Sequence, residues 1–283
     1  MRRFLQFSAL CLAVGALNAC TPEKVIITED IPTAGLRFIN AVSDTFAVDF
    51  RPVDIVENST FYGVAFRSTT LLFYKNARAG SRHFRIFYAV PTRTPPLTAE
   101  VQQQIASTVI KDTTLTLEAG HRYTFVLWGF TRTGSSPAVK LTVIDDNPSD
   151  PGTQVALRLV NTGGGLGALD GRQYASTGTS PAAATWASVA EYSASAYVSA
   201  ATGGIKFNVQ PAGGGAALFS DATALAGVAA SVDLEAQPGT TVAGSAVSGI
   251  VFPRSVTGSQ AASFTTPGII FVWDRRPPRP AGL

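Results

Sequence analysis

The chain has very little cysteine, since only Cys11 and Cys20 occur among its 283 residues. Cys11 lies within an apolar N-terminal stretch, so an exported form that has lost this stretch would keep Cys20 alone. A disulfide needs two cysteines, and the fold is therefore expected to be stable without one. Histidine is equally scarce. His83 and His121 have no second His or Cys at ligand spacing, so the sequence gives no support for a zinc site.

Charge is also sparse. Asp, Glu, Lys and Arg make up 14% of the residues, against about 25% in typical soluble domains. Binding to nucleic acid needs a clustered basic face. Here the clearest basic cluster is the tail with Arg275, Arg276 and Arg279. We therefore expect no nucleic-acid partner. The tail is expected to be a disordered terminus, with contact to peptidoglycan or acidic lipid as the alternative.

Enzyme motifs are missing as well. The sequence contains no G-x-S-x-G, no S-x-x-K and no H-E-x-x-H pattern. The glycine runs at 163–165 and 213–215 lack a following Lys-Ser/Thr and a helix, so they indicate loops rather than phosphate-binding sites. These absences favour a protein that is not an enzyme.

The N-terminus has the layout of a secretion signal. Arg2 and Arg3 precede an apolar stretch, residues 4–17, which small residues follow up to Cys20. The stretch is too short for a membrane span of about 20 residues. Two alternatives remain open, namely an ordinary cleaved signal and a twin-arginine signal.

Residues 17–20 (LNAC) resemble the bacterial lipobox, in which Leu stands three positions before the cysteine and a small residue stands directly before it. The resemblance implies that Cys20 carries diacylglycerol, becomes the new N-terminus and is then acylated. Each buried methylene contributes about 0.8 kcal/mol, so such an anchor is almost permanent. Thr21 is not the aspartate that retains lipoproteins at the inner membrane of enteric bacteria. The expected location is therefore the outer membrane of a bacterial cell envelope.

The rest of the chain predicts an all-β fold. Residues 204–210 (GIKFNVQ) alternate strictly between apolar and polar, which is typical of a half-buried strand, and residues 81–89 put Phe84, Ile86 and Tyr88 on one face. Residues 121–129 and 267–274 are denser in apolar side chains and suit strands covered on both faces. Only residues 99–106 show a helical period.

An internal repeat divides the chain into two modules. Residues 35–41 (GLRFINA) match residues 156–162 (ALRLVNT), with Arg37 aligned to Arg158 and Asn40 to Asn161. Four further matches follow in the same order: 61–66 with 186–191, 71–80 with 196–204, 114–120 with 231–236, and 141–146 with 270–274. The domain organisation that follows is a signal at 1–19, a lipidated tether at 20–34, sandwich modules at 35–147 and 155–275 around a linker at 148–154, and a Pro/Arg-rich tail at 276–283.

Two stretches carry a family resemblance. Residues 36–49 (LRFINAVSDTFAVD) and 117–129 (LEAGHRYTFVLWG) resemble the R-x-x-N-A-S-P-D-A-P-x-V-D start and the L-x-A-G-x-x-Y-T-x-x-x-x-G segment of the bacterial domain-of-unknown-function family 4397. The first module matches clearly and the second is degenerate. The resemblance implies two tandem immunoglobulin-like β-sandwiches in an exported envelope protein, and it carries over no catalytic residues.

A few residues stand out as candidates for structural or binding roles. Tyr123 is expected to anchor the core near a turn, with its hydroxyl bonded to backbone. Asp145, Asp146, Asn147 and Asp150 offer clustered oxygen ligands for Ca²⁺, although the spacing lacks a known calcium-loop pattern and an interdomain linker is the simpler interpretation. Trp128, Trp186 and Trp273 lie near strand ends and could form a surface on which sugars stack.

Three classes of function follow from these observations. The first is a non-enzymatic, lipid-anchored envelope protein with a structural, adhesion or scaffolding role, whose partners are the membrane and an envelope protein or polysaccharide. The second is a module that binds carbohydrate or peptidoglycan through exposed aromatic residues. The third, an enzyme, is disfavoured because no catalytic constellation is visible.

Overall fold

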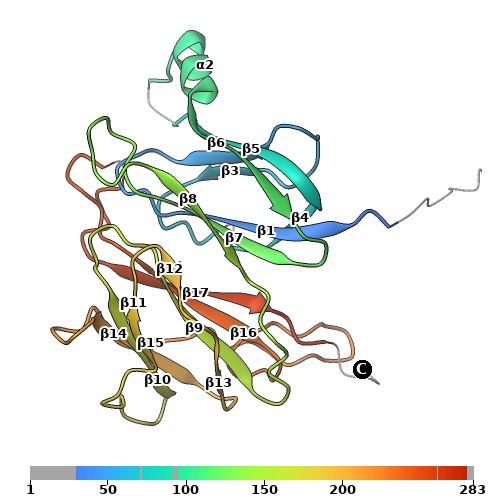
Figure 1. The fold of residues 1–283 in the computed structure, drawn as a ribbon, viewed down its shortest axis with the longest axis vertical. Coiled ribbons are helices and arrows are strands. Elements are labelled where there is room, and N and C mark those ends of the chain that lie inside the picture. The colour runs from blue at the N-terminus through green and yellow to red at the C-terminus, as the bar shows by residue number, and fades with distance from the viewer. Residues whose placement is uncertain (1–29, 71, 92–94, 260, 279–283) are drawn as a thin grey trace, which may run out of the picture. The chain divides into compact units, whose positions relative to one another are not determined.

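Strands make up nearly the whole fold. The structure, a computed structural model, describes residues 30–70, 72–91, 95–259 and 261–278. β-branched and aromatic residues dominate the segments between glycine- and proline-containing turns, and this composition favours a pleated, half-buried backbone. The prediction of an all-β sandwich fold is therefore confirmed. Figure 1 shows the arrangement of the strands.

The first half of the chain forms a pair of sheets, here called the first sandwich. One sheet has the order β4-β1-β7-β8, in which β1 and β7 run parallel, and the other has the order β3-β2-β5-β6. Their bounds are β1 Thr33–Asn40, β2 Val48–Pro52, β3 Phe61–Val64, β4 Lys75–Arg78, β5 Gly80–Tyr88, β6 Val109–Leu117, β7 Arg122–Trp128 and β8 Lys140–Asp145.

The second half repeats this order in a second sandwich. Its sheets are β12-β9-β16-β17, with β13 also paired to β9, and β11-β10-β14-β15; here β9 and β16 are the parallel pair. The bounds are β9 Val155–Asn161, β10 Leu169–Ala175, β11 Trp186–Val189, β12 Ser193–Ala194, β13 Val198–Ala200, β14 Ile205–Pro211, β15 Phe219–Thr223, β16 Ala246–Phe252 and β17 Gly268–Arg275.

One expected match between the halves is wrong. Residues 114–120 include the end of β6, whereas residues 231–236 lie in the connection between β15 and β16. Strand β15 takes the place of β6 in the second sandwich, because it is the strand that pairs with β14 at the sheet edge. The similar letters in 231–236 come from a loop.

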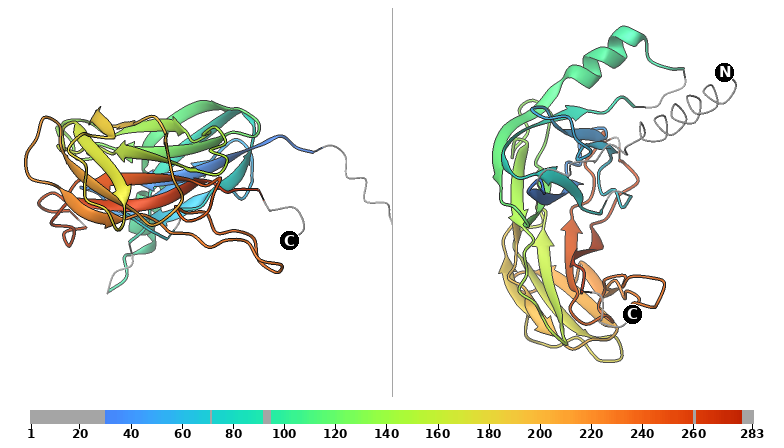
Figure 2. Two further views of the ribbon diagram at one scale, coloured as in Figure 1. Left: turned by 90° about the horizontal axis from the view of Figure 1, so that it is seen from below. Right: turned by 90° about the vertical axis from the view of Figure 1, so that its right-hand side faces the viewer.

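The expected helix does form. It is α2 (Ala99–Ser107), inserted between β5 and β6, and the Thr98 hydroxyl accepts a hydrogen bond from the Val101 N–H at its N-terminus. None of its residues is buried. Figures 1 and 2 show α2 standing clear of the sheets. No helix among the described residues is long and apolar enough to cross a membrane.

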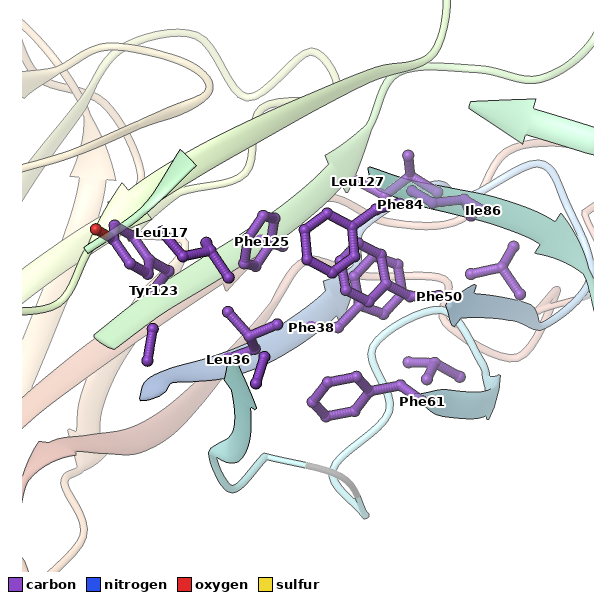
Figure 3. Packing of buried hydrophobic residues seen from close by; sticks show 14 of the residues in the cluster. Leu36, Phe38, Phe50, Phe61, Phe84, Ile86, Leu117, Tyr123, Phe125 and Leu127 are labelled. Carbon is purple, nitrogen blue, oxygen red and sulfur yellow. The ribbon is translucent and has the colours of Figure 1, made fainter. Parts of the chain in front are cut away.

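Phenylalanine rings fill the first sandwich. Phe50 lies at the centre, with its ring centroid 4.9 Å from that of Phe38, 5.0 Å from Phe84 and 5.2 Å from Phe125. Figure 3 shows these rings converging between β1 and β7 on one side and β2 and β5 on the other. The second sandwich has a separate core, built around Phe207, Trp186 and aliphatic side chains.

The two sandwiches meet along a third buried layer, here called the seam. Successive side chains of a strand point to opposite faces, so Leu36 and Phe38 of β1 enter the first core while Arg37 and Ile39 face the other way. The apolar side chains of the seam come from both sandwiches, and they include Ile39, Val126, Trp128, Val160, Ile250, Phe252 and Val272. This is why β1, β9 and β16 are buried on both faces.

Candidate functional site: a buried charge cluster in the seam

Four charged side chains are enclosed in the seam, and we call them the quartet. Arg37 lies in β1, Arg158 in β9, Asp146 directly after β8 and Asp274 in β17. No side chain of the four is more than 3% exposed. Each arginine stands between two apolar residues of its strand whose side chains enter the core of its sandwich. Because successive side chains of a strand point to opposite faces, the arginine faces the seam.

Each guanidinium of the quartet faces both carboxylates. Arg37 Nη2 lies 2.6 Å from Asp274 Oδ1 and 3.3 Å from Asp146 Oδ2. Arg158 Nη2 pairs closely with Asp146 Oδ1 and lies 3.6 Å from Asp274 Oδ2. Two positive and two negative charges are thus buried together, and the two closest pairs, Arg37 with Asp274 and Arg158 with Asp146, cross between the sandwiches.

Two hydroxyl side chains complete the hydrogen bonds in equivalent positions. Thr124 Oγ1 of β7 accepts from Arg37 Nε at 2.9 Å, and Ser248 Oγ of β16 accepts from Arg158 Nε at 2.6 Å. The Thr124 hydroxyl donates in turn to Asp146, and the Ser248 hydroxyl to Asp274.

Two tyrosines close the cluster in the same matched way. The Tyr74 hydroxyl donates to Asp146 Oδ2 at 2.8 Å, and the Tyr197 hydroxyl donates to Asp274 Oδ2 at 2.8 Å. The same rings lie against the guanidinium groups, with Arg37 4.6 Å from the Tyr74 centroid and Arg158 4.5 Å from the Tyr197 centroid. Buried charges are tolerated only when they are paired and hydrogen-bonded, and this cluster meets both conditions.

The electrostatics of the quartet differ between its two carboxyl groups. Burial raises the pKa of Asp146 above its ordinary value. Burial also disfavours the charge of Asp274, but the attraction of Arg158 and Arg37 outweighs it and lowers the pKa of Asp274. Burial raises the pKa of Tyr74 and Tyr197, so both hydroxyls stay protonated at neutral pH.

Aromatic contacts extend the seam beyond the quartet. Trp128 of β7 stacks on Tyr192 of the second sandwich with centroids 3.5 Å apart, and its Nε1 donates to Thr142 Oγ1. Phe66 of the first sandwich meets Phe252 of the second edge to face at 6.4 Å. The chemistry of this site is therefore cohesion between the sandwiches, with a polar centre that fixes their register and apolar flanks.

The structural residues expected from the sequence all lie in the described part of the chain. Tyr123 is 8% exposed, and its hydroxyl accepts a hydrogen bond from the Glu118 N–H at 3.1 Å. Asn40 donates to the Val64 carbonyl and accepts from the Val42 N–H. Asn161 makes the same kind of link, donating to the Val189 carbonyl and accepting from the Gly163 N–H. Both asparagines hold the turn that follows the first strand of their sandwich.

The four candidate calcium ligands have separate partners. Asp146 belongs to the quartet, Asp145 faces His121 at 3.1 Å, and Asp150 pairs with Arg275 at 2.9 Å while Asn147 is exposed. Within the described residues, no group of three or more His, Cys, Asp or Glu side chains could hold a metal ion.

The three tryptophans do not form one exposed surface. Trp186 is 4% exposed and stacks on Phe207 inside the second core, and Trp128 is 7% exposed in the seam. Only Trp273 is half-buried, at the edge of the seam. Cys20 lies outside the described residues.

Sequence reasoning missed the quartet as a unit. It aligned Arg37 with Arg158 and residues 141–146 with 270–274 as parts of the repeat, but the only role it gave Asp146 was that of a metal ligand. The available signal was an arginine in the middle of an apolar strand, repeated in both halves, together with an aspartate at the end of each matched final strand, 141–146 and 270–274. An aligned pair of opposite charges on covered strands indicates an ion cluster between repeats.

Comparison with known proteins adds one family. Residues 34–172 match the family model described as Domain of unknown function (DUF4397). The match covers β1 to β8 and continues through β9 into β10. No curated protein matches the chain.

Proposed function

This chain carries a module of the DUF4397 family, and we propose that it is a non-enzymatic, lipid-anchored protein of the bacterial cell envelope. Acyl chains on Cys20 hold it in the outer membrane, and the tether at 20–34 leads to the two sandwiches. The sandwiches act together as a rigid scaffolding or adhesion unit.

The observation that carries the rigid-unit role is the quartet. The two closest ion pairs, Arg37 with Asp274 and Arg158 with Asp146, cross the seam and favour one relative position of the sandwiches. Sliding would break both and leave each arginine only its longer contact within its own sandwich, at 3.3 and 3.6 Å. A pair of domains joined only by a linker would reorient under load. A unit locked at its seam transmits force between the anchor and whatever its far surface holds.

The anchor rests on the lipobox-like residues 17–20, and labelling with palmitate tests it. Wild-type protein and the variant Cys11→Ser are expected to incorporate label in the cell, because Cys11 lies within the removed signal. Cys20→Ser is expected to incorporate none. Protease treatment of intact cells then reports whether the sandwiches face the medium. An unlabelled wild-type protein found free in the periplasm contradicts the anchored role.

A further inference from the structure

A pocket of about 390 Å³ opens at the edge of the seam. Both sandwiches contribute to its walls, so it exists only because they are docked. The side chains that matter for its chemistry are Tyr74, Asn76, His121 and Arg122 from the first sandwich and Trp273 and Arg276 from the second.

Arg122 gives this pocket a positive charge without a counter-ion. Its Nη1 donates to the backbone carbonyl of Asp274 at 3.1 Å, and its guanidinium lies 5.6 Å from the Tyr74 ring centroid. No carboxylate in the described part of the chain forms an ion pair with it. The two arginines of the quartet, by contrast, each face two carboxylates. Arg122 is thus held in position by a carbonyl and a ring while its charge stays available.

Arg276 supplies a second cation to the lining of the pocket. It lies over the Trp273 ring, 5.7 Å from the centroid, and pairs with Glu235. The Glu235 side chain is 60% exposed, and exposed ion pairs contribute little free energy. A bound anion can therefore replace this contact at small cost.

A second pocket of about 370 Å³ adjoins the first at Trp273 and Arg276. Its walls include Leu225, Val228 and Pro238, which makes it less polar than the first. The two pockets together suit an extended ligand with an anionic group at one end and a weakly polar ring face at the other. Arginine recognises carboxylates through paired N–H donors, and the Asn76 amide can both donate and accept a hydrogen bond.

We propose that this double pocket binds a carboxylate-bearing sugar of an acidic polysaccharide. The carboxylate lies at Arg122 and Arg276, a sugar hydroxyl bonds Asn76, and the next sugar ring packs against Trp273 toward Leu225. The inference deepens the envelope role and rests on it, since it names the class of partner that the anchored unit would hold.

Calorimetric titration of the purified full-length protein tests the proposal. The protein is kept in a polyoxyethylene detergent, which offers no sugar of its own, and tetragalacturonate is the acidic probe, with maltotetraose as the neutral one. Tetragalacturonate is expected to bind, and its affinity is expected to fall as the salt concentration rises, because salt screens exposed charges. Maltotetraose is expected not to bind. Equal binding of both sugars, or no binding of tetragalacturonate, overturns the proposal.

Two substitutions localise the binding. Arg122→Gln is expected to lower the affinity for tetragalacturonate at least about tenfold. A hydrogen bond to a charged group contributes about 1.5 kcal/mol or more, and its loss has an effect of this size. Arg276→Gln is expected to weaken it less, because Glu235 already competes for that charge. Arg254→Gln, an exposed arginine outside both pockets, removes the same charge and is expected to change nothing. Unaltered binding by Arg122→Gln, with thermal unfolding as in the wild type, overturns the proposal.

A further titration with lipid vesicles tells whether the pocket takes its anionic ligand from a polysaccharide or from a lipid headgroup. Vesicles of phosphatidylglycerol that bind through Arg122, together with no binding of tetragalacturonate, overturn the polysaccharide assignment. Palmitate labelling does not depend on this pocket. Failure of the sugar titration therefore leaves the anchor tested separately.

Discussion

The two sandwiches share their strand order but not their cores. In the first, Phe38, Phe61, Phe84 and Phe125 surround Phe50, whereas in the second Phe207 packs with Trp186, Phe271 and aliphatic side chains. The quartet and its partners, by contrast, are matched one for one across the seam. A core tolerates many combinations of apolar side chains as long as its volume is kept. A buried ion cluster has no such freedom, because each change leaves a charge unpaired.

The connections differ in the same way as the cores. The first sandwich carries α2 between β5 and β6, where the second has only a short link between β14 and β15. The second instead has a long connection between β15 and β16, with exposed apolar side chains at Val228 and Leu234.

The largest expected effect is the loss of a quartet arginine. Arg37→Ala leaves Asp274 and Asp146 buried with one cation between them, and we expect it to lower the free energy of unfolding by about 3–5 kcal/mol. Arg158→Ala is expected to cost somewhat less, because Arg37 donates to the Trp273 carbonyl at 2.9 Å, whereas the matching bond from Arg158 to the Asp145 carbonyl is longer, at 3.5 Å. Urea unfolding followed by tryptophan fluorescence and circular dichroism measures both.

The control is Arg85→Ala, whose side chain is 41% exposed and pairs with the exposed Asp112; a change under about 1 kcal/mol is expected there. If Arg37→Ala costs no more than Arg85→Ala, the quartet does not hold the sandwiches together.

A smaller effect is expected from the turn asparagines. Asn40→Ala and Asn161→Ala each leave a buried carbonyl and a buried N–H without their side-chain partner, at a cost of about 1–3 kcal/mol. The loss for Asn161→Ala is expected to be the larger of the two, since Asn161 also donates to the Gly167 carbonyl at 2.8 Å. The midpoints of urea unfolding of the two variants measure both losses. A loss outside the range of about 1–3 kcal/mol for only one of them would show that the two turns are not equivalent.

The smallest effect concerns pH. The pKa of Asp274 is lower in the folded protein than the unfolded value of about 3.9. Its contribution to stability is therefore full above about pH 4 and is lost as the pH falls through the lowered value. The pKa of Asp146 is raised in the folded protein, so protonation of Asp146 on acidification favours the folded state.

Thermal unfolding between pH 3 and pH 6 separates the two carboxyls. Asp274→Asn is expected to flatten the loss of stability on acidification, because the carboxyl with the lowered pKa is gone. Asp146→Asn is expected to leave that loss in place or to make it steeper. The same response from both variants would contradict the assigned difference.

Local patterns predicted the elements well. Strict alternation identified β14, dense apolar runs identified β7 and β17, and the one helical period identified α2. Residues 231–236 misled, because strand-like letters in a loop cannot be told from a strand without knowing which neighbour they pair with. The tryptophans misled for a related reason. Composition does not say whether a ring at a strand end faces solvent, a core or a second sandwich.

The sequence by itself determined that the chain folds as strands, that it does so twice, and that Arg37 and Arg158 occupy matching positions. These follow from periods of two residues and from the repeat, which are local properties. Only the tertiary structure decided that the two matching arginines meet. Their outward-facing strand surfaces pack on each other, and this packing brings residues more than 200 positions apart, such as Arg37 and Asp274, within 2.6 Å. No local pattern encodes such a contact, because it depends on which sheet faces which.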